Sequence, residues 1–516
     1  MRLLNSKSKI VKIFTCFSLS ALLFPAFAQT LEFPVKRQES AETWRRDGLA
    51  MIEKRKNLKL RKGKAKNVIL FIGDGMGVST LTAARILEGQ LRGESGEENR
   101  LSFEEFPFSA LSKTYSANQQ TSDSAPTMSA IITGVKTDEG VFGVNQNVVR
   151  GDYRTVKGNE TKTLLEMAEE NGKSTGVVTT ARLTHATPGA CYAHTADRDW
   201  EADADILNRS KAAYDAKFPD IASQLLDFKF GDGLEVAIGG GRSKFLPKDF
   251  ADPEYADKKG ERLDGRNLPE EWTRKYKDAA YVWNRQQFDA IDTKKTKHLL
   301  GLFERSHLQY EVDRKNDKAG EPSLSEMTSK SIDVLSNNKK GYFLMVEGGR
   351  VDHAHHDGNA YRALTDAVEL SNAVRTAVSK VNLDETLIIV TADHSHTFTI
   401  AGYPARGNNI LGLVREVDEN GNVEKSPHTD GGGQPYTTLG YANGKGYRKG
   451  TRPTLTDEEV LNPDYKQEVT VPLAAETHGG EDVAIFATGV NAHLIGGSME
   501  ENWIFYVMQD AFRFKK

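Results

Sequence analysis

The sequence predicts an α/β protein with a large mixed, mostly parallel sheet, helices on both faces and an inserted subdomain. An apolar run at 67–72 leads through a tight glycine turn into a helical pattern at 79–91. This strand–turn–helix order is typical of the opening unit of a doubly wound sheet. Similar apolar runs, bounded by glycine or polar residues, recur along the chain as expected strands: 174–179, 234–238, 342–346, 385–391 and 483–487.

The start of the chain predicts export. A basic head, an apolar segment at 13–27 and small residues before position 28 describe a secretory signal peptide spanning 1–28. We therefore expect a mature catalytic domain of 29–516 in an exported, periplasmic or secreted protein. Cys191 is then its single cysteine, which excludes an intramolecular disulfide.

Composition argues against nucleic acid as a partner. The net charge is −4, and the one basic cluster, 54–66, falls on an expected N-terminal helix and its exit. A solvated face is the better interpretation of that cluster. Nothing after the leader is long and apolar enough for a membrane span, and the charged C-terminus has no lipid-anchor signal.

Polar side chains follow the expected strands where each one ends. Asp352 and His356 stand four apart after the run at 342–346, so a helical turn would place them on one face. Carboxylate and imidazole are ligands that zinc accepts. Together the strand ends present Asp74, Thr187, Glu347, Asp352, His356, Asp393, His394 and His478. Because five separate strand ends contribute, the pattern predicts a polynuclear metal centre rather than a solvated loop.

Two further residues have a functional and a plain interpretation. Ser124 would lie near a helix N-terminus that favours an anion, but taken alone it is better interpreted as a capping serine. Arg198 offers a planar fork for phosphate, but alone it reads as a member of a surface ion pair. No G-x-S-x-G elbow or P-loop spacing is present, so neither a hydrolase triad nor a nucleotide cradle is supported.

These motifs resemble those of the alkaline phosphatase family. The stretches that match are 67–77, 121–137, 179–200, 347–357, 391–396 and 476–486. The match extends over the mature chain and is closer to the animal enzymes than to the enterobacterial ones. The resemblance implies hydrolysis of phosphate monoesters, with release of phosphate, through a phosphoserine at a site with two zinc ions and one magnesium ion, and an alkaline pH optimum.

The resemblance also assigns roles residue by residue. One zinc would be held by Asp352, His356 and His478. The second would be held by Asp74, Asp393 and His394, with Ser124 as nucleophile. Magnesium would use Asp74, Thr187 and Glu347, and Arg198 would bind phosphate oxygens. His185 and His353 would stand beside the metals, as in the animal enzymes.

Two insertions and a dimer are implied as well. The polar range from about 252 to 321 is expected to form a metal-binding-like subdomain. The range from about 401 to 475 resembles the crown that animal enzymes place over a dimer interface, so a homodimer is expected. No membrane anchor is expected.

A fourth metal, calcium, is a further expectation from the resemblance. Its ligands would be the Phe303 carbonyl, Glu304 and Glu321. The family's remaining glutamate aligns near Ala216, where Asp215 is the adjacent acid. A pair of surface carboxylates is the alternative.

Two other functions remain as alternatives. A related phosphodiesterase or sulfatase is one, although residues 124–128 lack the arginine of the sulfatase modification motif. A phosphate- or metal-binding protein without turnover is the other.

Overall fold

The computed structural model describes residues 39–515, whose main feature is a 10-stranded sheet. The strand order is β15-β2-β14-β8-β1-β7-β3-β4-β6-β5. From β8 to β5 every neighbouring pair is parallel, whereas β14 runs antiparallel to both β8 and β2. The sheet is therefore mixed and mostly parallel, as the sequence predicts. Its strands are β1 (Asn67–Gly73), β2 (Phe108–Lys113), β3 (Ser174–Arg182), β4 (Val236–Gly240), β5 (Ala279–Val282), β6 (His298–Leu302), β7 (Tyr342–Gly348), β8 (Thr386–Ala392), β14 (Val483–Gly489) and β15 (Gly497–Glu500).

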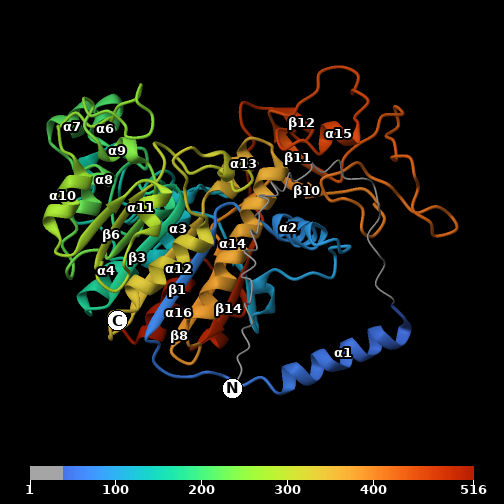
Figure 1. The fold of residues 1–516 in the computed structure, drawn as a ribbon, viewed down its shortest axis with the longest axis horizontal. Coiled ribbons are helices and arrows are strands. Elements are labelled where there is room, and N and C mark those ends of the chain that lie inside the picture. The colour runs from blue at the N-terminus through green and yellow to red at the C-terminus, as the bar shows by residue number, and fades with distance from the viewer. Residues whose placement is uncertain (1–38, 516) are drawn as a thin grey trace, which may run out of the picture. The chain divides into compact units, whose positions relative to one another are not determined.

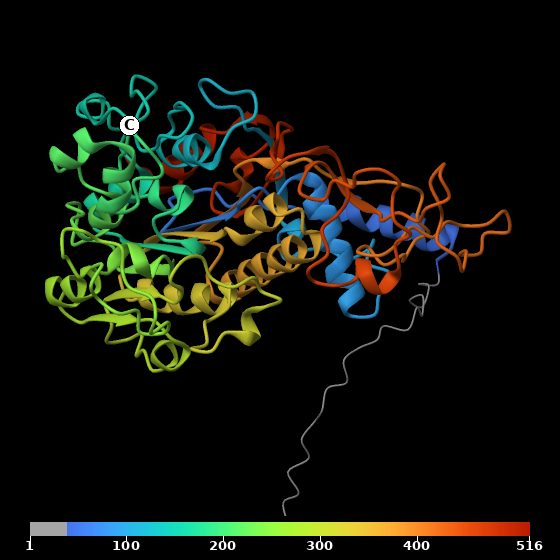
Figure 2. The same cartoon turned by 90° about the horizontal axis from the view of Figure 1, so that it is seen from above.

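Helices cover both faces of this sheet (Figures 1 and 2). The helices are α1 (Ala41–Lys56), α2 (Val78–Leu91), α3 (Ser124–Thr133), α4 (Leu164–Glu170), α5 (Ala186–Gly189), α6 (Asp203–Arg209), α7 (Lys211–Asp215), α8 (Ile221–Leu226), α9 (Arg242–Phe245), α10 (Leu268–Lys275), α11 (Arg285–Asp289), α12 (Leu324–Leu335), α13 (Arg350–His356), α14 (Ala360–Lys380), α15 (Asp457–Val460) and α16 (Trp503–Phe512).

Strand β1 shows why the sheet has two cores. Its side chains alternate between the faces, as those of any strand do. Val68 and Leu70 join one buried cluster, with apolar residues of α3, α4 and α16. Ile69 and Phe71 join the other, with apolar residues of α2, α12 and α14. Because both faces are covered, β1 reads as a continuous apolar run, which made it easy to predict.

The polar range 252–321 is not a separate subdomain throughout, which corrects the boundaries expected from the sequence. It contains β5 and β6, and both pair into the main sheet. Strand β6 is only five residues long and buried, so its signal was hidden among polar neighbours. Strands β2 and β15 were also missed. The side chains of β2 alternate between buried and more exposed positions, and β15 has only four residues, of which one is buried.

The range 401–475 carries a small sheet of its own. Strands β10 (Phe398–Ile400), β11 (Leu439–Gly444) and β12 (Val469–Pro472) form it, in the order β10-β11-β12. A separate apolar cluster of Leu413, Leu455, Val460 and Tyr465 lies within this range. In Figure 1 these elements stand together at the upper right. A last pair of short strands, β9 (Ser395–His396) and β13 (His478–Gly479), is antiparallel.

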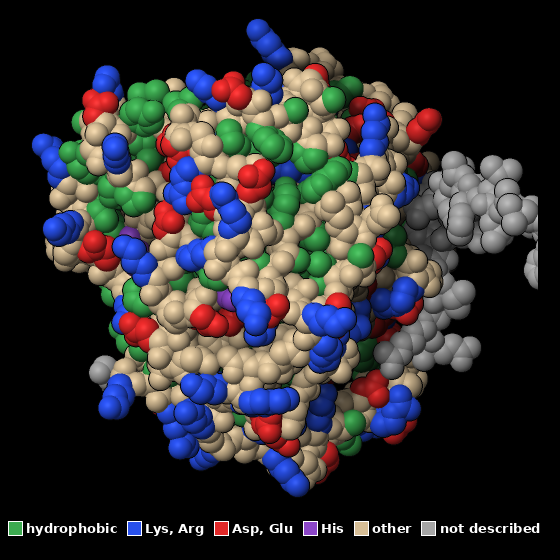
Figure 3. Space-filling model, turned by 60° about the vertical axis from the view of Figure 1, so that its left-hand side comes forward, with side chains coloured by type: hydrophobic (Ala, Val, Ile, Leu, Met, Phe, Trp, Pro, Cys, Tyr) green, Lys and Arg blue, Asp and Glu red, His purple; other side chains and the backbone are tan. Residues whose placement is uncertain are grey.

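The predicted signal peptide, 1–28, lies outside the described residues. Among the helices from 39 to 515, none combines the length and apolarity that a bilayer span needs. On the face drawn in Figure 3, basic and acidic side chains are interspersed, which agrees with the small net charge.

Candidate metal centre and active site

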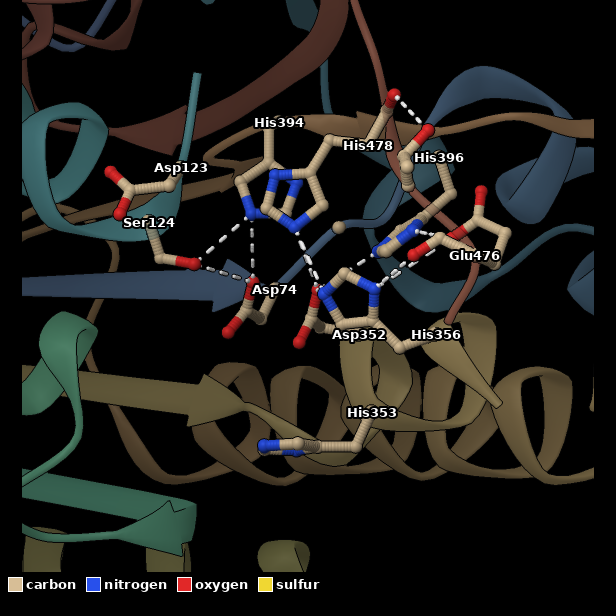
Figure 4. Close-up of polar contacts among 12 residues, drawn as sticks. Asp74, Asp123, Ser124, Asp352, His353, His356, His394, His396, Glu476 and His478 are labelled. Carbon is tan, nitrogen blue, oxygen red and sulfur yellow. Dashed lines mark hydrogen bonds and ion pairs between the residues drawn. The ribbon is translucent and has the colours of Figure 1, made fainter. Parts of the chain in front are cut away.

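The carboxyl ends of the central strands bring the predicted site residues together. Asp74 follows β1, and Glu347 lies near the end of β7. Asp393 and His394 follow β8 directly. Parallel strands end at one edge of a sheet, and ligands of open α/β sheets gather at that edge. Figure 4 shows Asp74 and His394 lying close to Ser124.

Ser124 begins helix α3, as its position near a helix N-terminus predicted. Its side chain is buried, and its Oγ lies 3.0 Å from His394 Nε2. The same Oγ donates to Asp74 Oδ1 at 3.4 Å. Asp123 holds the N-cap position but makes no capping hydrogen bond with its side chain. Ser124 therefore faces into the site with its hydroxyl between a carboxylate and an imidazole.

Asp74 and Asp393 are fully buried and only half satisfied. Asp393 Oδ1 accepts hydrogen bonds from the backbone of Gly75 and His394, at 3.1 and 3.0 Å. The Oδ2 atoms of both aspartates have no partner among the described residues. Burial, with the neighbouring Asp393 carboxylate next, raises the pKa of Asp74 well above its ordinary range. A cation between the two carboxylates would offset the cost of burying their charges.

A second set of oxygens lies beside Asp74. Thr179 donates a short hydrogen bond to Glu347 Oε2, while Glu347 Oε1 has no partner within 39–515. The hydroxyl of Thr187 is likewise buried and unpartnered. Burial raises the pKa of Glu347 to about 7. Oxygen atoms from Asp, Glu and Thr suit a hard ion such as magnesium.

Imidazoles surround Asp352 on the other side of the site. Asp352 Oδ1 lies 2.9 Å from His396 Nε2, 3.2 Å from His356 Nε2 and 3.4 Å from His478 Nε2. The Nε2 atoms of His356 and His478 are 3.1 Å apart. Helix α13 does place Asp352 and His356 on one face. Although burial alone would raise it, His356 and His396 hold the pKa of Asp352 well below its ordinary range.

Backbone carbonyls orient these imidazoles. His356 Nδ1 lies 2.6 Å from the Glu476 carbonyl, and His478 Nδ1 lies 2.7 Å from the Ser122 carbonyl. When each Nδ1–H donates to its carbonyl, the Nε2 lone pair is turned inward. This arrangement is common for metal-binding histidines.

Arg198 is a half-buried member of the site rather than a surface residue. Its guanidinium donates to Asp123 Oδ2 at 2.8 Å and lies 3.2 Å from His185 Nε2. Asp123 stands next to Ser124 in sequence, so the ion pair ties Arg198 to the start of α3. The arginine fork is therefore held near the Ser124 hydroxyl.

His185 and His353 lie beside the centre, and a third histidine joins them. The ring of His307 is 4.0 Å from that of His353 and 5.6 Å from that of His185. His353 Nδ1 lies 2.9 Å from the Gly349 carbonyl, and Figure 4 shows this ring set apart from the converging imidazoles. His307 also contacts Arg182 at 2.5 Å.

The residues expected to bind calcium lie near the carboxyl end of β6. Some of the acids beside them differ from those expected from the sequence. Three acidic side chains, Glu254, Glu304 and Asp317, bring oxygens within 4.8 Å of one another. Burial raises the pKa of Glu321 to about 9, and its Oε2 has no partner within 39–515. The Phe303 carbonyl accepts from Arg242 at 3.0 Å. Asp215, the acid next to the position of the family's remaining glutamate, is exposed and pairs with Lys211 at 2.6 Å.

Sequence reasoning gave no role to several residues of the centre. His396 contacts Asp352, and its Nδ1 lies 2.6 Å from Glu476 Oε2. His396 is also why position 75 is glycine: a Cβ there would lie 2.3 Å from His396 Nε2, at a φ of +66°. The alternation Asp393-His394-Ser395-His396 could have indicated that both imidazoles turn to one side. Nothing local pointed to Glu254 and Asp317, because they lie in separate loops.

The donor set fits metal ions. Buried orphan atoms belong to Asp74, Thr187, Glu347 and Asp393. Imidazole nitrogens converge with carboxylates on one side, and oxygens predominate on the other, where a His185 nitrogen lies within 4.8 Å of Asp74 and Glu347 oxygens. This division matches the preferences of zinc and magnesium. The fold and this site define an α/β protein with a metal centre at the carboxyl edge of its sheet.

Comparisons with known proteins identify the family. The alkaline phosphatase family model matches residues 65–514. The tissue-nonspecific alkaline phosphatase of Felis catus is 45% identical over 482 residues, covering 92% of this chain and 88% of that protein. The human tissue-nonspecific isozyme is 46% identical, covering 87% and 84%, and the Gadus morhua enzyme is 45% identical, covering 87% and 92%. The chain belongs to the alkaline phosphatase family and is a phosphomonoester hydrolase.

Solved structures agree with the fold. The alkaline phosphatase of Thermus thermophilus has a TM-score of 0.62 at 22% identity, covering 89% of this chain and 94% of that one. The enzyme of the Antarctic bacterium TAB5 has a TM-score of 0.58 at 21% identity, covering 88% and 100%. The family implies metal ions and phosphate monoester substrates.

Proposed function

We propose that this enzyme hydrolyses phosphate monoesters through a phosphoserine on Ser124, at a site with two zinc ions and one magnesium ion, and works best at alkaline pH. The observation that carries the proposal is the position of the Ser124 hydroxyl. It lies between Asp74 and His394, at the start of a helix and near Arg198. A serine in that environment can attack phosphorus, whereas a capping serine would face its own helix.

The family resemblance assigns the ligand sets, and the convergence of these side chains supports the assignment. Asp352, His356 and His478 would hold one zinc, and Asp74, Asp393 and His394 the other. Asp74, Thr187 and Glu347 would hold magnesium. Bound zinc would supply Lewis-acid polarisation and would lower the pKa of a hydroxyl beside it. His396 touches Asp352 and Glu476, so we assign it to orienting the first set.

Ser124 carries the covalent step. Its oxygen attacks phosphorus in line with the ester oxygen, and the bond to the alcohol breaks as the serine phosphate forms. Water then attacks the serine phosphate, which releases inorganic phosphate and restores the hydroxyl. The positive end of α3 lies at Ser124 and favours the negative charge of the bound phosphoryl group.

Arg198 binds the phosphoryl oxygens that do not react. Its planar fork suits two oxygens at once, and Asp123 fixes its direction through the 2.8 Å contact. His185 lies 3.2 Å from the same guanidinium and restricts its movement from the other side. We propose that His185 and His353 tune how tightly product is held, because a neutral imidazole attracts phosphate less than an ammonium group would.

The phosphoenzyme is the decisive test. Brief reaction with a ³²P-labelled monoester and an acid quench should leave label on the wild-type chain, and Ser124→Ala should carry none. Ser122→Ala is the matched control, because Ser122 serves the site through its backbone carbonyl. A label that persists in Ser124→Ala would remove the serine from the mechanism. A faster rate on bis-substituted phosphates would favour a phosphodiesterase, and no turnover after zinc loading would favour a binding protein.

We also infer a structural calcium ion at the carboxyl end of β6. The ligands that the structure supports are Glu254, Glu304, Asp317 and Glu321. Their clustered and partly unpartnered oxygens support this proposal.

Export after removal of 1–28, a crown-like role for 401–475 and a homodimer remain proposals from the family resemblance. Light scattering and N-terminal sequencing of the exported protein would test them.

A further inference from the structure

The amino ends of the central strands carry lysines, at the edge of the sheet opposite to the active site. Lys66 precedes β1 and Lys173 precedes β3, each by one position, and Lys340 precedes β7 by two. These three strands are neighbours in the order β1-β7-β3. In Figure 1 the chain enters β1 at the lower edge of the sheet, on the side where the C-terminus is marked.

These lysines line a pocket of about 350 Å³, which we call the amino-end pocket. Its lining residues are Lys64, Ala65, Lys66, Asn171, Lys173, Lys340 and Phe514. Four of them are cations, and none is an acid. The volume lies at the lower end of the range of small-molecule sites, roughly 300–1,000 Å³. A pocket with four positive charges and no internal counter-charge is set up for an anion.

Lys173 is the lysine of this pocket whose position is fixed by buried contacts. Its side chain is buried, with 5% of the residue exposed. Its ammonium donates to the Lys66 and Lys340 carbonyls, at 2.7 and 2.8 Å, and lies 4.5 Å from the centre of the Phe512 ring. An ammonium group has three N–H donors, so one is left beyond these two carbonyls. The backbone thus fixes the position of a charge that no carboxylate neutralises within the described chain.

The other lysines add charge of the same sign. Burial, followed by the charges of Lys64 and Lys66, lowers the pKa of Lys173 to about 8. The Lys340 ammonium lies over Gly172, where an added Cβ would come within 2.7 Å of it. An anion bound among these lysines would offset their mutual repulsion.

We propose that the amino-end pocket binds a compact oxyanion with at least two negative charges, of the size of a diphosphate. Lysine ammonium groups bind phosphate as point charges, without the planar geometry that arginine requires. Several donors from different strands suit several oxygens of one ligand. The pocket lies at the opposite edge from Ser124, so its ligand is bound rather than hydrolysed.

Methylenediphosphonate is the probe, because its P–C–P bridge resists hydrolysis. Calorimetric titration of the metal-loaded enzyme, after unbound zinc and magnesium have been removed, should show two binding events per wild-type chain. Lys64→Met/Lys340→Met should weaken one event by about tenfold or more per lysine. Arg198→Ala should weaken the other. Lys157→Met, an exposed lysine outside the pocket, is the control and should change neither.

Charge reversal gives an independent reading. Lys64→Glu should abolish the pocket event and raise the melting temperature at low salt, because it supplies the missing carboxylate. Hydrolysis of p-nitrophenyl phosphate should be unchanged in these Lys64 and Lys340 variants. The proposal is overturned if Lys64→Met/Lys340→Met binds the probe as the wild type does, or if the wild type shows a single event that only Arg198→Ala removes.

Discussion

Strands β1 and β7 have acids at their carboxyl ends and lysines just before their amino ends. At the carboxyl edge, Asp74 follows β1 and Glu347 lies near the end of β7, and each has a buried oxygen without a partner within 39–515. At the amino edge, Lys66 and Lys340 precede the same two strands, around a pocket without acids. Both strands are paired with neighbouring strands along their length. The difference in charge between the two edges therefore comes from single residues at the strand ends. A buried, unpartnered carboxylate oxygen is stabilised by a cation and a cluster of ammonium groups by an anion, so the side chains that line each site indicate the sign of its ligand.

Removal of metal should have the largest effect, and it acts at the carboxyl edge alone. Without cations, the carboxylates of Asp74, Asp393 and Glu347 repel one another in a buried site, so chelation should abolish turnover and lower the melting temperature. Zinc together with magnesium should restore both. Metal content measured beside the rate is the check. Full activity in a sample verified as metal-free would show that the buried carboxylates at the carboxyl edge do not need cations for turnover.

Loss of the ion pair between Asp123 and Arg198 should have the next largest effect on catalysis. Asp123→Asn keeps the shape but removes the charge that holds Arg198, so kcat/KM for a monoester should fall by about 10–100-fold. Asp199→Asn changes a nearby acid that pairs with Arg150 and Arg209 and should have little effect. An equal loss in the two variants would mean that general charge, rather than the position of Arg198, matters.

The amino edge also holds a pair of buried acids. Their ionisation should make the stability of this edge depend on pH. Glu235 accepts from Thr175 N at 2.6 Å, and Glu169 accepts from Thr175 Oγ1 at 2.6 Å. Burial raises the pKa of Glu169 to about 9 and that of Glu235 to about 8, from an ordinary 4.5. The folded state therefore keeps protons that the unfolded state releases, so their contribution to stability is complete below pH 4.5 and is lost as pH rises to about 9.

Glu169→Gln should protect the fold at high pH. The amide removes one charge from the pair, so the free energy of unfolding at pH 9 should rise by about 1–3 kcal/mol relative to the wild type. At pH 5 the two proteins should differ little. Urea denaturation across this range is the measurement, with Glu170→Gln, an exposed neighbour paired with Lys162, as the control. A gain of the same size at both pH values would point to packing instead of ionisation.

What could be predicted from the sequence depended on how local the signal was. Strands β1, β7 and β8 are long apolar runs that end in acids or histidines, so both the sheet and the metal centre were visible. Strand β5 has four residues, and little in such a segment separates it from a loop. The amino-end lysines gave no signal, because each is one charged residue before a strand. Lys64 and Lys66 were interpreted as part of a solvated face, and only the fold brings Lys173 and Lys340 beside them.

The smallest predicted effect concerns β6. We expect that acids after this strand bind a cation, as those after β1 and β8 are proposed to do. Glu304 follows β6 and lies within 4.8 Å of oxygens from Glu254 and Asp317, so calcium should bind there and favour the folded state. At ten times its Kd, calcium should add about 1.4 kcal/mol to the stability of the zinc-loaded enzyme, seen as a higher melting temperature. Glu304→Gln should erase the gain, whereas Glu261→Gln, which pairs with Lys244 and Arg305, should keep it. If calcium still stabilises Glu304→Gln, the ion binds elsewhere. Cation binding by acids at strand ends would then be limited to the strands around Ser124.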